Sequence, residues 1–219
     1  MSATGPTEPP RNCPLCPRLV DFREEWRAKE PGWHNAPVST FYPEGGAGEV
    51  RLLIVGLAPG VRGANRTGRP FTGDYAGTLL YGTLHKHGFA NDRFNADPND
   101  GLKLFGTAVT NSVRCVPPEN KPVGAEINTC RQFLSATIAS LPKLQAIVTL
   151  GRIAHDSTVR TLGLKLKDQP FSHGGQLPAG AYTLFPTYHC SRYNTNTGRL
   201  TEEMFDKVFA NVARFLAAT

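Results

Sequence analysis

The sequence predicts an α/β fold in which helices cover both faces of a mostly parallel, four-stranded sheet. Two observations support this prediction: strand-like segments alternate with helical patterns along the chain, and the first of these segments, VRLLIVGLAP, is a continuous apolar run rather than apolar at every second residue. Continuous apolar runs are typical of strands buried on both faces, and their alternation with helices is typical of a parallel sheet. The predicted strands lie in the ranges 50–59, 104–114, 144–151 and 181–189.

Helices are expected before, between and after these strands. A charged helix that begins near residue 17 is stopped by Pro31 and Gly32. Further helices are predicted over 76–88, over 124–140, over a short stretch after Gly151 and over 200–218. The last of these has an apolar stripe for the core, and it carries Glu202 and Glu203 at its amino end, where the helix dipole favours negative charge.

The length and charge of the chain favour one domain with a polyanionic partner. At 219 residues the chain is long enough for one α/β domain but too short for two of full size. Its 24 Lys and Arg residues exceed its 18 Asp and Glu residues, and the net charge of +6 suits a polyanion, although plain solubility is the alternative. Residues 1–12 are rich in proline and polar residues, so we expect a disordered tail there, followed by a single domain over 13–219.

The sequence predicts no membrane partner and a cytoplasmic location. No stretch approaches the roughly 20 apolar residues that a membrane span needs. The amino end lacks the basic and apolar regions of a secretory signal.

Five cysteines make a fully paired disulfide framework unexpected. Cys13 and Cys16 form a C-x-x-C motif, Cys115 and Cys130 lie far downstream, and Cys190 is expected to be a bystander. Four thiolates suit a zinc site or an iron–sulfur cluster. The alternative is that Cys115 and Cys130 are core residues and the C-x-x-C motif is a redox pair.

Three loops that follow predicted strands are rich in residues that suit ligand binding. They cover residues 56–77, 111–122 and 189–199. Gly and Pro let the backbone approach a ligand closely, and Asn, Asp, His and Arg supply directional hydrogen bonds. Because ligands bind outside the carboxyl ends of parallel strands, we expect the three loops to converge on one crevice.

The segment TYHCSRYNTNTGRL raises the question of a nucleophilic dyad. If His189 and Cys190 continue a strand, their side chains point to opposite faces and cannot form a nucleophile–base pair. Ser191 lies outside any G-x-S-x-G motif, which disfavours a serine hydrolase. The segment is therefore interpreted as a polar loop in which Arg192 and Tyr193 suit contacts to phosphates and bases.

Several long motifs resemble one known family. The motifs GLAPG (56–60), NRTGRPFTGD (65–74), TNSVRCVPPENKP (110–122) and HCSRYNTNTGRLT (189–201) look like those of the type-5 uracil-DNA glycosylases (UDGb), iron–sulfur members of the uracil-DNA glycosylase superfamily. The cysteines at 13, 16, 115 and 130 match the family's cluster ligands in order and approximate spacing. The resemblance spans nearly the whole chain.

The resemblance implies a three-layer αβα sandwich that holds a [4Fe–4S] cluster on Cys13, Cys16, Cys115 and Cys130, with zinc in the same ligands left open. It also implies a monofunctional enzyme that flips deaminated bases out of DNA and hydrolyses their N-glycosidic bond, leaving an abasic site. Uracil, hypoxanthine and xanthine are the expected bases. DNA that contains them is the expected partner of a monomeric, nucleoid-associated protein.

The resemblance further implies roles for three side chains around the base. His189 would donate to the O2 region of uracil, Asn111 would pair with the uracil edge, and Phe71 would stack on the flipped base. We therefore expect a pocket lined by these three residues. The alternatives are a structural histidine, a turn-forming asparagine and a phenylalanine that fills the core.

The first motif implies a close approach of the backbone to the base. Gly56, Ala58 and Gly60 would allow this approach and donate amide hydrogen bonds, but the motif contains no carboxylate to activate water. Asp74 is the best carboxylate candidate for catalysis, and its alternative role is the N-cap of the helix that follows.

Contacts to DNA are expected from the basic loops. Arg192 would enter the duplex or clamp a phosphate, with Ser191 beside it, and Arg66, Arg69 and Lys121 are weaker candidates for backbone contacts.

Two rival functions stay open at the level of the sequence. The first is a non-catalytic, metal-containing DNA-binding module, and the second is a nucleotide or phosphate-ester hydrolase. The second is weakly supported because the glycine-bearing loop matches neither common phosphate-binding motif.

Overall fold

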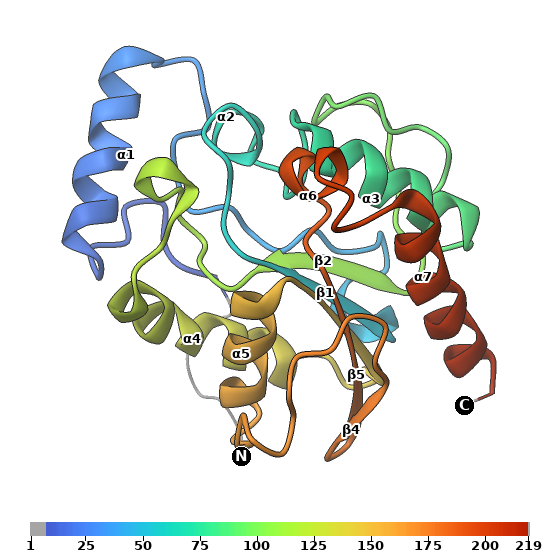
Figure 1. The fold of residues 1–219 in the computed structure, drawn as a ribbon. Helices are drawn as coiled ribbons and strands as arrows, with labels where there is room; N and C mark the ends of the chain where they lie inside the picture. The colour runs from blue at the N-terminus through green and yellow to red at the C-terminus, as the bar shows by residue number, and fades with distance from the viewer. Residues whose placement is uncertain (1–7, 219) are drawn as a thin grey trace.

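A computed structural model describes residues 8–218, and its strands form one central sheet in the order β2-β1-β3-β5-β4 (Figure 1). The strands are β1 (Leu52–Gly56), β2 (Thr107–Asn111), β3 (Ala146–Leu150), β4 (Leu177–Ala179) and β5 (Tyr182–Thr187). All pair in parallel except β4, which runs antiparallel to β5. The predicted fold class is confirmed, but the predicted number of four strands is wrong. The edge strand β4 is only three residues long and contains Pro178, so it lacks the apolar run that marks the other strands.

The predicted helices are present, and two short helices were not predicted. The helices are α1 (Pro17–Lys29), α2 (Ala64–Thr67), α3 (Tyr75–Lys86), α4 (Gly124–Ala139), α5 (Arg152–Thr161), α6 (Arg192–Asn196) and α7 (Glu202–Ala217), with short 3₁₀ turns η1 (Gly46–Glu49) and η2 (Pro118–Asn120). The segment that forms α6 was predicted as a loop. It is polar and has no apolar stripe, but Ser191 caps it by accepting a hydrogen bond from the Asn194 amide at 3.4 Å.

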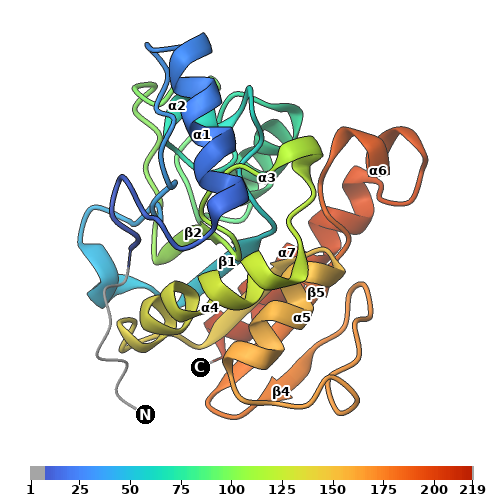
Figure 2. The ribbon, with the colours of Figure 1, turned by 90° about the vertical axis from the view of Figure 1, so that its left-hand side faces the viewer.

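The sheet is the middle layer of a three-layer sandwich. Leu52 and Ile54 of β1 pack in the core cluster that contains α3 and α7, whereas Leu53 and Val55 pack in the cluster that contains α4 and α5. This alternation follows from the two-residue period of a strand. Figures 1 and 2 show α3 and α7 on one face of the sheet and α4 and α5 on the other.

The carboxyl-terminal helix α7 closes one of these layers. Thr201 caps it by accepting a hydrogen bond from the Met204 amide at 3.1 Å. Its buried side chains lie on the predicted stripe and are Phe205, Val208, Phe209, Val212 and Leu216. None of the helices in the described part of the chain is long and apolar enough to cross a membrane.

Part of the predicted disordered tail is in contact with the domain. Glu8 forms an ion pair with Arg114, whose side chain is fully buried, at 2.8 Å, and its other oxygen accepts from the Thr40 amide at 3.0 Å. A buried guanidinium needs such a partner, because an unpaired buried charge costs several kcal/mol. The expectation of disorder therefore does not extend to residues 8–12, and residues 1–7 lie outside the described part of the chain.

The burial of α7 predicts the effect of shortening one of its core side chains on stability. Phe209→Ala should lower the free energy of unfolding by about 3–5 kcal/mol, because it removes a fully buried ring and leaves a cavity. Phe105→Ala is the matched control: Phe105 is 50% exposed, so its loss should be less than about 1 kcal/mol. Urea unfolding of both variants measures the difference, and equal losses would contradict the assignment of α7 to the core.

Candidate active site

A cleft of about 770 Å³ opens at the carboxyl ends of the parallel strands. The segments that line it follow β1, β3 and β5, and others come from η2 and from the amino end of α3. A volume of this size is typical of sites that enclose a small molecule. The cleft residues that matter for chemistry are Ala58, Gly60, Asp74, Asn120, His189 and Arg192.

The convergence of loops on this cleft was predicted from the parallel sheet, and it is observed. The loop after β2 contributes Asn120 rather than Asn111, and a fourth segment, Gly151–Ala154 after β3, was not predicted to line the site. Gly151 adopts φ 90°, and a Cβ there would lie 3.4 Å from the Cβ of His189. The two segments therefore pack tightly beside each other.

His189 lines the cleft with an imidazole that burial keeps neutral. Desolvation lowers the pKa of His189 to about 4. Among the described residues its ring has no hydrogen-bond partner, whereas its backbone oxygen accepts from Asn194 Nδ2 at 2.8 Å. Cys190 next to it is buried, and its thiol lies 3.5 Å from the Ala76 oxygen. The two side chains do not form a dyad, as predicted.

Asp74 caps α3 and also lines the cleft. Its Oδ1 accepts from the Gly77 amide at 3.3 Å, which caps α3. Its Oδ2 lies against Gly60 and Gly63, where added Cβ atoms would meet it at 3.3 Å and 2.5 Å. Burial raises the pKa of this carboxyl, and backbone hydrogen bonds from Gly77 and Ala76 oppose the rise. A carboxylate with a raised pKa at the wall of a cleft is typical of a functional site.

The side chains of Asn111 and Phe71 lie where a side chain at Gly56, the last residue of β1, would be. Gly56 pairs with Asn111 in the sheet register, and a Cβ on Gly56 would lie 2.4 Å from Asn111 Oδ1 and 2.5 Å from Phe71 Cζ. The Phe71 ring also stacks near His189, with ring centroids 5.9 Å apart. Asn111 Oδ1 is buried and has no hydrogen-bond partner among the described residues, which is unusual for a buried polar atom.

The prediction that Asn111 and Phe71 line the pocket is wrong for this conformation. They are 2% and 7% exposed and lie directly behind the wall that His189 forms. The sequence placed them at strand and loop ends but did not show that one side chain from β2 and one from the loop before α3 close over Gly56.

The predicted DNA-contacting residues divide into two groups. Arg192 and Ser191 line the cleft, and the Arg192 guanidinium lies 5.3 Å from the centre of the Tyr75 ring. Arg66 and Lys121 are exposed but do not line the cleft.

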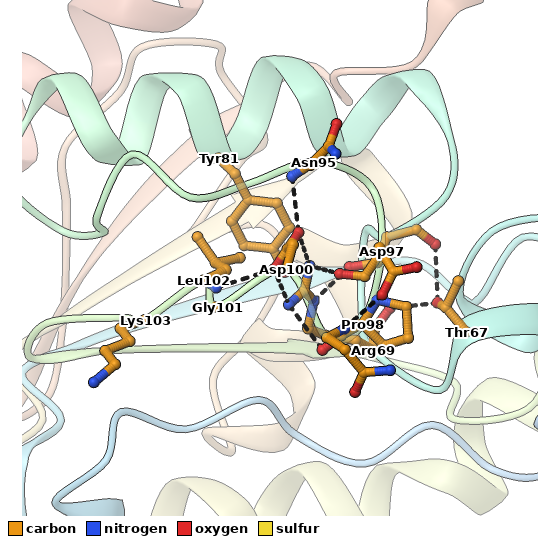
Figure 3. A network of polar contacts seen from close by, with 12 residues as sticks. Thr67, Arg69, Tyr81, Asn95, Asp97, Pro98, Asp100, Gly101, Leu102 and Lys103 are labelled. Carbon is orange, nitrogen blue, oxygen red and sulfur yellow. Dashed lines mark hydrogen bonds and ion pairs between the residues drawn. The ribbon is translucent and has the colours of Figure 1, made fainter.

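The prediction that Arg69 contacts DNA is contradicted. Arg69 is 7% exposed and forms a two-bond ion pair with Asp100, at 2.8 Å on both oxygens (Figure 3). Sequence reasoning missed this because the partner is 31 residues away in a loop without regular structure.

The four spaced cysteines come together around one small cavity, away from the cleft. Cys13, Cys16, Cys115 and Cys130 all line it, together with the buried Arg23. Burial is the largest cause that raises the pKa values of Cys115 and Cys130, to about 12 and about 11. No group of three or more His, Cys, Asp or Glu side chains within residues 8–218 is arranged to hold a metal ion.

Asn120 is the cleft residue that sequence reasoning missed. It lies at the end of η2 with φ 56°, in the left-handed region that asparagine tolerates better than most residues. Its position inside a long motif, beside two prolines, was the signal that could have singled it out.

This fold and site define the class of the protein. Over residues 42–213 the chain matches the family model described as the uracil DNA glycosylase superfamily. The chain therefore belongs to the uracil-DNA glycosylase superfamily. This confirms the predicted family and, with it, the predicted class of enzyme, a hydrolase of N-glycosyl bonds.

Similar curated proteins narrow the class to one group. A type-5 uracil-DNA glycosylase of Thermus thermophilus is 43% identical over 204 residues, which are 92% of this chain and 93% of that protein. One from Pyrobaculum aerophilum is 34% identical over 206 residues, 92% of this chain and 88% of that protein. A type-4 uracil-DNA glycosylase of Sulfurisphaera tokodaii is 31% identical over 174 residues, 76% of this chain and 72% of that protein. The predicted resemblance to the type-5 group is confirmed.

The contacts around Gly56 predict that two glycine substitutions have opposite effects on the free energy of unfolding. Gly56→Ala should be destabilising by about 1–3 kcal/mol, because the new methyl overlaps Asn111 and Phe71. Gly82→Ala in α3 meets no atom within 4 Å and should raise the free energy of unfolding by up to about 1 kcal/mol. Thermal unfolding of both proteins checks the signs, and a neutral Gly56→Ala would show that the contact relaxes easily.

Proposed function

We propose that this chain removes uracil from DNA by hydrolysing the N-glycosidic bond after the nucleotide has flipped into the cleft. The observation that carries the proposal is the buried, unpartnered Asn111 Oδ1 beside the Phe71 ring. A buried acceptor without a partner costs about 1–3 kcal/mol, and a ligand that donates to it recovers this cost once the side chains that separate Asn111 from the cleft have moved aside. The ligand is therefore expected to be flat and to carry an N–H donor.

The donor and acceptor pattern of an amide suits deaminated bases. Uracil presents an N3–H donor beside the O4 acceptor, and an asparagine amide accepts from the first and donates to the second. Hypoxanthine presents the same pair on N1–H and O6, and xanthine does as well, whereas cytosine and adenine present it reversed. Guanine and thymine share the pair, so their rejection must depend on the 2-amino group of guanine and the 5-methyl group of thymine. We propose that the chain excises uracil, hypoxanthine and xanthine.

His189 is proposed to stabilise the departing base. At neutral pH its imidazole is uncharged, because burial lowers the pKa to about 4, and one ring nitrogen carries a proton. A neutral donor aimed at the O2 region gains strength as negative charge builds on the base. The Phe71 ring beside it would stack on the base, a contact worth about 1–3 kcal/mol.

Asp74 is proposed to act on the sugar side of the bond. Its carboxylate at the cleft wall can orient water or offset the positive charge that develops on the deoxyribose. Ala58 and Gly60 leave room for the base edge, since neither brings a long side chain into the cleft. Arg192, Ser191, Arg66 and Lys121 are proposed to contact the DNA backbone, which the net charge of +6 also favours. The chain would do this as a monomer.

The four cysteines fit the [4Fe–4S] cluster that the type-5 family implies. Cys13, Cys16, Cys115 and Cys130 surround one cavity with otherwise mostly apolar walls, and none of its lining residues is shared with the cleft. A cluster there would join the amino-terminal segment to α4 and would serve stability rather than the excision step. A single zinc ion would need all four sulfurs about 2.3 Å away, so zinc in the same four cysteines is the alternative that the measurement below distinguishes.

The proposed function is tested by base release from labelled duplexes that carry one central uracil, hypoxanthine or xanthine, scored by alkaline cleavage. Asp74→Asn should lower the single-turnover rate by on the order of 100-fold or more while the cap of α3 is kept, since Asn caps a helix as well as Asp. Because burial raises the pKa of Asp74 above its unfolded value, the charged form costs stability as the pH rises through that pKa. The variant should therefore be at least as stable as the unchanged protein at pH 7.

Asp206→Asn is the control, since Asp206 pairs with Lys86 and His87 on the surface and does not line the cleft. It should leave excision unchanged. Binding to damaged DNA without release of any base would favour the non-catalytic module, and an Asp74→Asn protein of full activity would assign Asp74 to the cap alone.

The cluster proposal predicts different results for two cysteines. Cys115→Ala should abolish visible absorption near 400 nm and lower the unfolding temperature, whereas Cys190→Ala should keep the absorption, because Cys190 lies outside the cysteine cavity. Iron and sulfide analysis after anaerobic purification completes the measurement. Zinc in colourless protein would contradict the cluster.

A further inference from the structure

Arg69 is the most completely bonded side chain near the active site. Its five N–H groups all donate: Nε to Thr72 Oγ1 at 2.8 Å, Nη1 to Asp100 Oδ1 and the Pro98 oxygen, and Nη2 to Asp100 Oδ2 and the Asp97 oxygen. A guanidinium has only these five donors, so none is left for DNA or substrate. Figure 3 shows Asp97, Pro98 and Asp100 gathered around it.

The loop between α3 and β2 is folded around this interaction. The Asp100 carboxylate also accepts from the amides of Asn95 at 2.8 Å and Leu102 at 3.0 Å (Figure 3). These bonds and the Arg69 guanidinium hold the pKa of Asp100 low, at about 2, against the opposing effect of burial, so that the carboxyl is charged at neutral pH. The loop thus presents a fixed anion to Arg69.

The residues that follow Arg69 are held as firmly. The Tyr81 hydroxyl donates to the Pro70 oxygen at 2.6 Å, and Thr67 Oγ1 donates to the Thr72 oxygen at 3.0 Å. Between these points Phe71 adopts φ 52°, a left-handed conformation that costs a residue with a large side chain of order 1–3 kcal/mol. The conformation persists because the flanking hydrogen bonds leave the backbone no alternative.

This restraint fixes the positions of two proposed active-site groups, Phe71 and Asp74. Phe71 carries its ring over Gly56 to within 5.9 Å of His189, and Asp74 follows three residues later at the cleft wall. We propose that Arg69 and Asp100 are positioning residues for base excision, which act by holding the Phe71 ring and Asp74 in place for the flipped nucleotide. The inference rests on the proposed function.

Stability alone does not account for the pair. Arg69 lies 5.4 to 5.9 Å from the ring centres of Phe41, Tyr81 and Phe94, so an apolar side chain would also pack well there. Buried ion pairs are often no more stabilising than apolar residues of the same volume. An apolar side chain would make no hydrogen bonds. The five hydrogen bonds of the guanidinium fix the segment around Arg69 relative to the loop between α3 and β2.

The test is Arg69→Lys, which keeps the charge but cannot make the planar, five-donor arrangement. Its single-turnover rate of uracil excision at saturating enzyme should fall about 10- to 100-fold, as expected for a reacting group displaced by about 1 Å. Its dissociation constant for a duplex with an abasic site should change by less than about 3-fold, since Arg69 does not line the cleft.

Arg51→Lys is the matched control. Arg51 donates to Gln145 and to the Leu216 oxygen at the amino end of β1, the opposite end of the strand from the cleft. It should lower stability without changing the excision rate. Thermal unfolding of both variants separates a loss of folded protein from a loss of rate.

A double-mutant cycle shows whether Arg69 acts through Phe71. The loss of rate in Arg69→Lys/Phe71→Ala should be at least about 3-fold smaller than the product of the two single losses, because a ring that is absent cannot be misplaced, and the loss that remains reports the displacement of Asp74. If Arg69→Lys does not fold, Thr72→Val removes the acceptor of the Nε bond, together with the bond from Thr72 Oγ1 to the Pro70 oxygen at 3.2 Å, and should produce the same pattern with a smaller loss.

An unchanged excision rate in a folded Arg69→Lys or Thr72→Val protein would overturn the inference, and so would losses that multiply in the double variant. A protein with its natural sequence that excises no base would instead overturn the proposed function.

Discussion

The close approach of Asn111 and Phe71 to Gly56 is the constraint on which the rest of the site depends. Parallel pairing of β1 and β2 sets Gly56 opposite Asn111, and the missing side chain at Gly56 leaves the space that Asn111 Oδ1 and the Phe71 ring occupy. His189 then stacks beside the Phe71 ring from the end of β5, with β3 between β5 and β1 in the sheet. The buried strands thus act as a rigid frame that fixes the distances between groups from distant parts of the sequence.

The site gathers several groups in states that cost stability. Asn111 has a buried acceptor without a partner, Phe71 has a left-handed backbone, and the buried Asp74 carboxyl has a raised pKa. Such features are typical of functional sites, where strain and unmet hydrogen bonds are retained for binding and catalysis. The surrounding structure offsets this cost in stability through the two core clusters and through buried ion pairs, among them the Arg69–Asp100 pair near the site.

A second anchor lies at the cysteine cavity. Arg114, fully buried, pairs with Glu8 and donates to Thr40 and Thr137, and its amide donates to the sulfur of Cys130. The amino-terminal segment is therefore attached to the domain by a buried ion pair. This attachment explains why a segment of prolines and polar residues has a defined path from residue 8 onward.

The fold class, the main helices, the family and the three cleft-forming loops could be predicted from the sequence, because hydrophobic periodicity, glycine and proline positions and long motifs are local properties of a chain. The folded structure was needed to show that Arg69 is paired inside the protein, that Asn111 and Phe71 lie behind the cleft wall, and that Asn120 and the start of α5 join this wall. It also decided that β4 extends the sheet. These outcomes depend on burial and on partners tens of residues away, and a side chain's own type contains no information about which distant group will pair with it.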